Sequence, residues 1–469
     1  MSPYRPSQSG AMFALLLAAA PALASKDDPR HVMPAAPPAF SPGTPSCATI
    51  VPQGPLSVTD LIDVALCRNP ITAASWAGVR VAAANIGVAR GNYYPQITVG
   101  AGPQLNRNRY FNPNNIGGST TTTSLNSTAN IAIDYLLFDF GGRSAEVDAA
   151  RASERVALAN YADSAQSVVF NTIAAYNALQ AAIAAEAATE ANVAYLKNSL
   201  DNARGRMRAG VTTPADSLQA ETAYEQARFT LVQAQGNTQV ARGQLAVAVG
   251  LLPQTPLQLA PTPPLASVDM LGRNIDSLLD EAQRLRPDIA AARAQSAVAE
   301  ANVRSAQALS KPSISTSASS GASYADTQRD SVTTAVGISL TVPLFTGYRY
   351  AYQVTAARAA LDQANAQTKV TEQSAALDVW NNRSALETQL KSLSSARALI
   401  RSAQASADIA QGRFKAGVGT ITDTLNAASA LATARQQLVA AEYGVRDAQA
   451  GLAKSIGALG ETVDSMRTR

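Results

Sequence analysis

The sequence predicts a mixed α and β fold in which one arrangement of helices and paired strands occurs twice along the chain. Three observations predict it. A glycine-containing segment recurs at 205–216 and 412–423. The hydrophobic period changes from helical to alternating at Pro95 and again at Pro312. A long stretch without proline follows each alternating region, and each is long enough for a helix of about 100 Å.

The recurring segment has the features of a turn between two helices. Glycine accepts the left-handed backbone at a helix end, so Gly210 and Gly417 are expected to end one helix. Thr213 and Thr420 are expected to cap the next helix, each with an aspartate three residues later. That pattern is a capping box. Each segment therefore predicts the tip of a helical hairpin.

The N-terminus predicts export and then an extended arm. Arg5, an apolar run and a small-residue site predict a signal peptide at 1–24, cleaved after Ala24. Residues 25–55 are rich in proline and predict an arm without regular structure. After the signal peptide, no stretch approaches the about 20 apolar residues of a membrane helix.

Composition argues against several classes of function. Lys and Arg are not clustered, which argues against nucleic acid as a partner. His31 is the single histidine in the sequence, which argues against an imidazole zinc site or histidine catalysis. No phosphate-binding glycine loop is present. We therefore expect no cofactor, no metal and no enzymatic activity. Cys47 and Cys67 predict a disulfide in an exported protein, with two unpaired thiols as the alternative.

The first repeat is expected at 56–252. A capping box at Ser57 begins its helices, which end near Gly91. Two strands follow, at about 95–110 and 125–140, with a polar loop from Asn106 to Ser124 between them. A long helix then leads to the tip at 205–216, and a return helix runs from Pro214 to about Val249.

The second repeat is expected at 274–460, after a proline-rich linker at 253–273. Asn274 is expected to cap its first helix, and its hairpin tip lies at 412–423. Its strands are expected at about 313–324 and 331–345, and a C-terminal tail at 461–469. Apolar residues at steps of three and four predict coiled-coil seams on the two long helices: Val169, Ile173, Tyr176, Leu179 and Ile183, and then Leu386, Leu390, Leu393 and Ile400.

The strands have the alternation of a membrane barrel. Ile131 and Ile133 fall on one face, whereas Asn130 and Asp134 fall on the other. Four strands cannot close a barrel in lipid, so several chains must share one. Three chains would supply twelve strands around a channel. The long helices would project from the membrane as a second tube.

The chain resembles the TolC family of outer-membrane efflux and secretion channels. The resemblance rests on the tandem repeat, the order of elements, the Leu-Phe-x-x-Gly-Gly-Arg turn at 137–143 and the Ala-Gly-Val tips. It implies a homotrimer with a twelve-stranded β-barrel in the outer membrane and an α-helical coiled-coil barrel in the periplasm. It also implies the exit duct of a tripartite efflux or type I secretion system, opened by a periplasmic adaptor and an inner-membrane pump or ABC transporter. The chain lacks a lipid-anchor cysteine, and in this respect it is more similar to the secretion-type members of the family than to the lipoprotein drug-efflux members.

The resemblance also implies a gate at the hairpin tips. Asp423 matches the first acidic residue of the family's constriction, and the second is Asn426 here. Asp216 matches an aspartate that helps to hold the tip closed, but its usual arginine partner falls at Gly419. Phe414 stands where an aromatic residue is common. The remaining arginines of the tips are Arg206 and Arg413. Two alternatives stay open for them: they are substitute partners for the aspartates, or they lie at helix C-termini because the helix dipole favours positive charge there.

The tips themselves are the expected docking sites for the adaptor: Ala209, Gly210 and Val211 in the first hairpin, and Ala416, Gly417 and Val418 in the second. The alternative function is a trimeric coiled-coil surface adhesin or structural stalk. Such chains place one set of strands at the C-terminus, whereas here strands are expected twice. An exported enzyme is a further alternative, which the lack of clustered acids and histidines disfavours.

Overall fold

The structure is a computed structural model that describes Val32, Pro34, 36–37, 54–111, 119–261, 273–325 and 329–467. The expected signal peptide, Cys47 and most of the expected arm lie outside the described residues. The chain divides into two compact units. The first unit contains the sheet and comprises 1–37, 80–154 and 297–361. The second contains the helical hairpins and comprises 38–79, 155–296 and 362–469.

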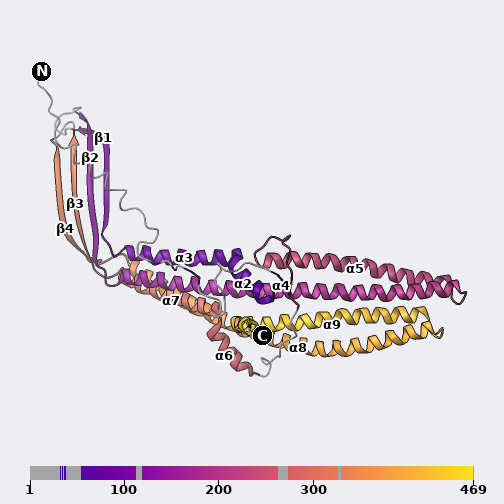
Figure 1. Cartoon of the computed structure of the whole chain (residues 1–469). Coiled ribbons are helices and arrows are strands. Elements are labelled where there is room, and N and C mark those ends of the chain that lie inside the picture. Colours follow the sequence, from indigo (N-terminus) through magenta and orange to yellow (C-terminus); the bar gives the residue numbers. More distant parts are fainter. Residues whose placement is uncertain are drawn as a thin grey trace, which may run out of the picture. The chain divides into compact units, whose positions relative to one another are not determined.

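The elements follow one another in the same order in each half of the chain (Figure 1). The first half contains α2 (Val58–Arg68), α3 (Pro70–Gly91), β1 (Gln96–Phe111), β2 (Ser119–Phe138), α4 (Gly142–Arg208) and α5 (Pro214–Ala248). The second half contains α6 (Ile275–Leu285), α7 (Pro287–Ala308), β3 (Ser313–Ala325), β4 (Ser331–Thr341), α8 (Arg349–Lys415) and α9 (Ile421–Ser455), and α10 (Leu459–Arg467) ends the described chain.

The predicted helix starts are confirmed. Ser57, Thr213 and Thr420 each accept a hydrogen bond from the backbone of an aspartate three residues later, and that aspartate accepts one in return. Asn274 caps α6 through Asp276 N–H at 3.2 Å. These local signals specify helix starts because each one satisfies backbone donors that the helix itself leaves unpaired.

The four strands form one antiparallel sheet in the order β1-β2-β3-β4. The register places apolar residues of all four strands on one face. For example, Ile97 lies opposite Ile133, which lies opposite Ala318, which lies opposite Val336. The next row, on the other face, contains Gln96, Asp134, Ser317 and Gly337. The predicted alternation is therefore confirmed across the whole sheet.

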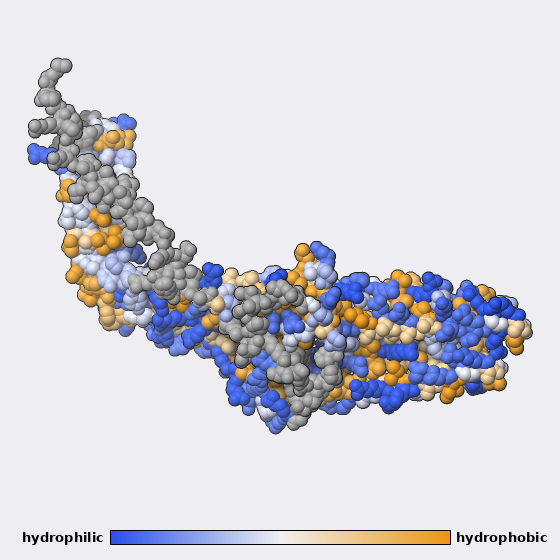
Figure 2. Space-filling view, in the orientation of Figure 1, coloured by the Kyte–Doolittle hydropathy of each residue, from blue (hydrophilic) through white to orange (hydrophobic). Residues whose placement is uncertain are grey.

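The apolar face of the sheet is exposed in the single chain. Exposed fractions are 67% at Val99, 78% at Val336 and 75% at Ile338. Figure 2 shows hydrophobic residues on the surface of this sheet, interspersed with polar ones. An apolar sheet face of this extent requires lipid or protein to cover it.

Two predicted strand boundaries are wrong. The first strand ends at Phe111, close to the expected 110, but the second begins at Ser119 rather than at about 125, so most of the loop expected from Asn106 to Ser124 is paired strand. The threonines of this segment are β-branched and favour strands, so their polarity was a misleading sign of a loop. In the other hairpin, β4 ends at Thr341, short of the expected Phe345.

The helical unit contains two equivalent junctions. Asn69 follows α2 and donates from Nδ2 to the carbonyl of Ala248, the last residue of α5, at 2.9 Å. Arg286 follows α6 and donates to the carbonyl of Ser455, the last residue of α9, at 3.1 Å. The start of α3 therefore lies at the end of α5, as expected from the shorter return helix.

Most of the predicted seam residues are buried. Val169, Ile173 and Leu179 are 0%, 3% and 1% exposed, but Ile183 is 37% exposed, so its assignment to the seam is wrong. Ile183 instead lines a groove beside the segment from Pro253 to Pro261. Beyond this level, buried residues of α4 continue at Leu196, Leu200 and Ala203.

The expected tail at 461–469 is helical as far as Arg467. α10 buries Leu459 and Val463 completely, against Ile62 and other residues of α2, α4 and α9. Leu459 and Val463 are four residues apart, which places them on one helical face. A short amphipathic pattern near the end of the chain was sufficient for a packed helix.

Among the described helices, α4 has an 18-residue stretch that is apolar enough to cross a membrane, with a mean hydropathy of 1.3. This corrects the expectation that no such stretch follows the signal peptide. Within the unit, 39% of that stretch is buried. The helix supplies apolar side chains such as Val168 and Val169 to the cores of the helical unit, and core helices pass the same test of composition.

Candidate functional site

The two hairpin tips have the same backbone geometry. In the first, Val211 N–H donates to the Arg206 carbonyl and Gly210 N–H donates to the Met207 carbonyl, both at 3.0 Å. Gly210 has a φ of 71°, in the left-handed region that glycine adopts without strain. These two bonds form a Schellman motif, which satisfies the last carbonyls of α4.

In the second tip, Val418 N–H donates to the Arg413 carbonyl at 3.0 Å, and Gly417 N–H donates to the Phe414 carbonyl at 3.1 Å. Gly417 has a φ of 83°. The Schellman motif of the first hairpin is therefore repeated. The predicted turn chemistry is confirmed at both tips.

The tip aspartates act as caps within their own hairpins. Asp216 accepts hydrogen bonds from the Thr212 hydroxyl and from Thr213 N–H. Asp423 accepts one from Thr420 N–H at 3.4 Å. In the described part of the chain, neither aspartate forms an ion pair. Gly419, which stands where the family has the arginine partner of Asp216, has no side chain to form that link.

The two aspartates differ in their electrostatic environment. The hydroxyl of Thr212, followed by the backbone of Thr213, lowers the pKa of Asp216 below the ordinary value. Arg206 lowers it further through its charge. Asp216 is therefore held firmly as a carboxylate by its own loop. Asp423 has no counterpart of Thr212, because Gly419 occupies that position.

Arg206 makes the direct polar contact between the tips of the two hairpins. Its Nη1 donates to the carbonyl of Phe414 at 2.7 Å, and its guanidinium lies 5.1 Å from the centroid of the Phe414 ring. Arg206 lies at the end of α4, whereas Phe414 lies at the end of α8. The arginine therefore supplies positive charge to the C-terminus of a helix in the other hairpin, where the helix dipole favours it.

The side chain of Phe414 is buried in the first hairpin. It is 3% exposed and packs in a cluster with Leu200 and Ala203 of α4 and Ala220 of α5. Farther from the tips, the Tyr195 hydroxyl of α4 donates to the Ala407 carbonyl of α8 at 3.1 Å. These contacts hold the four helices of one chain together near the tips, and Figure 1 shows both turns at the same end of the helical unit.

Three of the sequence-predicted gate residues are exposed in the single chain: Arg413, Asp423 and Asn426. They do not contact Arg206 or Asp216 through any hydrogen bond or ion pair among the described residues. The structure therefore separates the predicted set into two parts. Arg206 and Phe414 join the hairpins, whereas the other three are exposed and make no such contact among the described residues.

The expected docking residues are exposed at both tips: Ala209, Gly210, Val211, Ala416, Gly417 and Val418. Val211 is 63% exposed and Val418 is 68% exposed. A groove lies beside the first tip between α4 and α5, lined by Arg204, Met207 and Leu218 among others. An ion pair between Arg204 and Glu221, at 2.9 Å, closes one side of it.

Sequence reasoning missed Thr212 and Tyr195. Thr212 falls within the recurring segment, and its alignment with Gly419 signals that the two tips differ there. The contact from Tyr195 has no local signal, because Ala407 is more than 200 residues away in the sequence. The one available signal is the hydroxyl of Tyr195 itself, because a hydroxyl that becomes buried between helices needs a hydrogen-bond partner.

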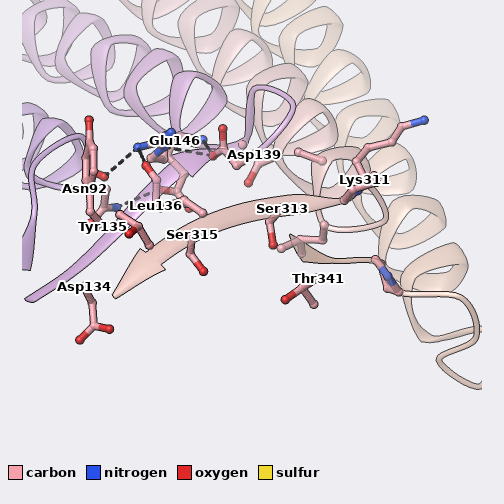
Figure 3. Close-up of a pocket in the computed structure, with 18 of the residues that line it drawn as sticks. Asn92, Asp134, Tyr135, Leu136, Asp139, Glu146, Lys311, Ser313, Ser315 and Thr341 are labelled. Carbon is pink, nitrogen blue, oxygen red and sulfur yellow. Dashed lines mark hydrogen bonds and ion pairs between the residues drawn. The ribbon is translucent and has the colours of Figure 1, made fainter. Parts of the chain in front are cut away.

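A pocket in the sheet unit lies where the strands meet the helices (Figure 3). Two of its three carboxylates, those of Asp139 and Glu146, are engaged in structural contacts. Asp139 pairs with Arg143 at 3.3 Å, and Glu146 accepts from Asn92 at 3.0 Å. Arg143 also donates to the Leu136 carbonyl at 2.6 Å. In the Leu-Phe-x-x-Gly-Gly-Arg turn, Arg143 therefore links the start of α4 to the end of β2.

Cys67 forms a disulfide, and Cys47, the other cysteine of the sequence, lies outside the described residues. The pairing of these two cysteines stays a prediction. Within the described residues, no group of three or more His, Cys, Asp or Glu side chains is placed to hold a metal ion.

Comparison with known proteins gives a consistent result over most of the chain. The family model described as outer membrane efflux protein matches residues 61–251 and again 278–458. Protein CyaE of Bordetella pertussis is 31% identical over 423 residues, which cover 87% of this chain and 86% of that protein. Outer membrane protein TolC of Escherichia coli is 25% identical, covering 84% of this chain and 80% of that protein.

The fold is also that of a solved structure. The CmeC outer membrane channel of Campylobacter jejuni superimposes with a TM-score of 0.75 at 18% identity, covering 88% of each chain. At this identity the likeness concerns the fold. The mixed α and β architecture predicted from the sequence is thereby confirmed.

Proposed function

The chain belongs to the outer membrane efflux protein family, and on this premise we propose that it is the outer-membrane exit duct of a tripartite efflux or type I secretion system. It acts as a passive channel that opens at its periplasmic helical tips. Its partners are a periplasmic adaptor and an inner-membrane pump or ABC transporter, which supply the energy. The duct performs no bond chemistry and needs no cofactor.

The open sheet is the observation that carries this proposal. Its apolar face is exposed, and among the described residues β1 and β4 each lack a partner strand on one side. Unpaired strand edges are not tolerated in lipid, so further chains must pair with them. Three copies supply twelve strands, with apolar residues toward lipid and polar residues toward a water-filled channel.

The two pairs of strands also weigh against a surface adhesin or stalk. Such a chain has one set of strands at its C-terminus, whereas here a pair of strands precedes each helical hairpin.

The gate is proposed at the tips. Arg206 ties the hairpins of one chain together through Phe414, which leaves Arg413, Asp423 and Asn426 for contacts between chains and with ions. In a trimer, the Asp423 carboxylates form a ring of three at the entrance and attract cations. The Ala-Gly-Val tips receive the adaptor, which shifts the hairpins from a closed to an open arrangement.

Single-channel recording from the reconstituted protein tests the gate. We expect cation-selective currents that a trivalent cation, such as La³⁺, blocks from the side of the tips. Asp423→Asn keeps an oxygen for the cap but removes the charge, so it should weaken this block about tenfold or more. Asp216→Asn is the matched control and should leave the block unchanged, because its loop holds that residue. Equal block in all three proteins would refute the ring, and a folded protein without conductance would refute the duct.

A further inference from the structure

The sheet sorts its few charged residues between its two faces. The described strands contain three, namely Arg107, Arg109 and Asp134. Asp134 lies opposite Gln96 on the polar face. Arg107 and Arg109 alternate in register with the apolar residues of β1 and therefore lie on the apolar face.

The two arginines lie immediately beyond the apolar band. The outward positions of β1 that precede them are all apolar: Ile97, Val99, Ala101, Pro103 and Leu105. From Ile97 to Leu105 this row runs over nine residues, within the about 9–11 residues that a tilted strand needs to cross a membrane. Arg107 occupies the next outward position, and Arg109 the one after it. Both lie toward the β1–β2 turn, the end of the sheet remote from the helices.

The acid of the β1–β2 hairpin, Asp134, lies on the opposite face of the sheet from the two arginines. The sequence from Gln96 to Ile133 has no Asp or Glu. Arg107 is exposed and makes no ion pair with a described carboxylate. Arg109 donates from Nε to the Ser119 hydroxyl at 3.0 Å, and Ser119 belongs to the same outward face. That bond fixes one edge of the guanidinium along the sheet surface.

We propose that Arg107 and Arg109 form a binding site for the phosphate groups of lipids in the outer leaflet of the outer membrane. This inference rests on the proposed function, because it takes the apolar face as facing lipid and the β1–β2 turn as lying at the cell surface. A guanidinium binds phosphate through parallel N–H donors, and a long side chain lets its head reach the polar layer while its stem covers apolar surface.

A carboxylate of a neighbouring chain is the competing partner. Asp330 precedes β4, and β4 is an edge strand that another copy of the chain would meet. An ion pair between chains would stabilise the oligomer without lipid. The lipid proposal instead requires binding that depends on the lipid phosphates.

The test measures binding of lipid A with two phosphates to the purified full-length protein in detergent, by native mass spectrometry. Arg107→Gln/Arg109→Gln should weaken binding about 30-fold, which corresponds to about 1 kcal/mol for each arginine. Arg397→Gln/Arg401→Gln is the matched control, since it removes two exposed arginines from α8, outside the sheet. The control should bind lipid A as the wild type does.

Two further arms identify the ligand. Dephosphorylated lipid A should bind the wild type and the double variant equally weakly, and millimolar inorganic phosphate should compete little. Equal binding of lipid A to wild type and double variant would overturn the proposal. A variant that falls apart into monomers without lipid would assign the arginines to a contact between chains. Channel currents from the double variant separate this inference from the proposed function, because normal currents with altered lipid binding are expected.

Discussion

The guanidinium of Arg206 donates to the carbonyl oxygen of Phe414 at 2.7 Å, so the last turn of α4 is bound to the last turn of α8. The same carbonyl accepts Gly417 N–H from the tip of the second hairpin. Arg413, the counterpart of Arg206 in the repeat, is exposed and makes no equivalent contact. Two hairpins with the same backbone therefore differ in role, since the first holds the second.

Arg206→Gln should loosen the second tip. The substitution removes a charge-assisted hydrogen bond, and such bonds contribute about 1.5–3 kcal/mol. We expect the amides of Gly417 and Val418 to exchange hydrogen about tenfold faster, measured by exchange mass spectrometry. Arg413→Gln is the matched control and should leave these amides unchanged. Equal exchange rates in the two variants would show that the bond to Phe414 contributes nothing to holding the tip.

Phe414→Ala should open the same tip by another route. The ring is buried among Leu200, Ala203 and Ala220, and its removal should cost about 3 kcal/mol through lost contacts and an unfilled cavity. Trypsin cleavage after Lys415 should then be about 100-fold faster, because cleavage follows the population of the opened segment. Met207→Ala, at the corresponding place in the first hairpin, should change cleavage after Lys415 little. Similar protection in wild type and Phe414→Ala would contradict the packing described here.

Replacing glycine by alanine should have opposite effects on stability at two positions five residues apart, one in the turn and one inside α4. Gly210 has a positive φ, so Gly210→Ala should cost about 1 kcal/mol. Gly205 lies inside α4 with open space where a Cβ would be, so Gly205→Ala should stabilise by about 0.5–1 kcal/mol. In thermal unfolding followed by circular dichroism, Gly205→Ala should have the highest midpoint temperature, the wild type an intermediate one and Gly210→Ala the lowest. The reverse order would refute the turn geometry.

Asp163→Asn should raise thermal stability at pH 7. Burial, and then the charge of Asp288, raise the pKa of Asp163, although Lys454 and Arg286 partly oppose this. The folded state therefore disfavours the charged form, a cost that is present above the raised pKa and disappears as pH falls toward the ordinary value near 4. The variant should exceed the wild type by a few degrees at pH 7 and match it near pH 4. A difference independent of pH would exclude this electrostatic cause.

Local chemistry made much of the fold predictable. The caps at Ser57, Thr213 and Thr420 depend on residues three positions apart, so the sequence contains the complete signal. The faces of the sheet were predictable because side chains alternate strictly along a strand. The polarity of the threonine-rich end of the β1–β2 hairpin predicts a loop, whereas the structure has paired strand there, because threonine is β-branched and favours strands.

The contacts between hairpins were beyond local reasoning. The sequence allows two roles for Arg206, a partner for an acid or a residue favoured at the end of its own helix. The structure shows a third, in which it binds the end of a helix about 200 residues later in the chain. Likewise, the burial of Leu459 and Val463 depends on a surface formed by α2, α4 and α9. Such contacts require the packed unit and are not encoded in any short segment.

The most direct test of a duct closed at its hairpin tips is the single-channel conductance of the reconstituted protein beside its Arg206→Gln variant. We expect small, cation-selective currents from the wild type and larger or longer openings from the variant, with the same selectivity. Identical currents would contradict closure by the bond between Arg206 and Phe414. Absence of current from both folded proteins would contradict the channel itself.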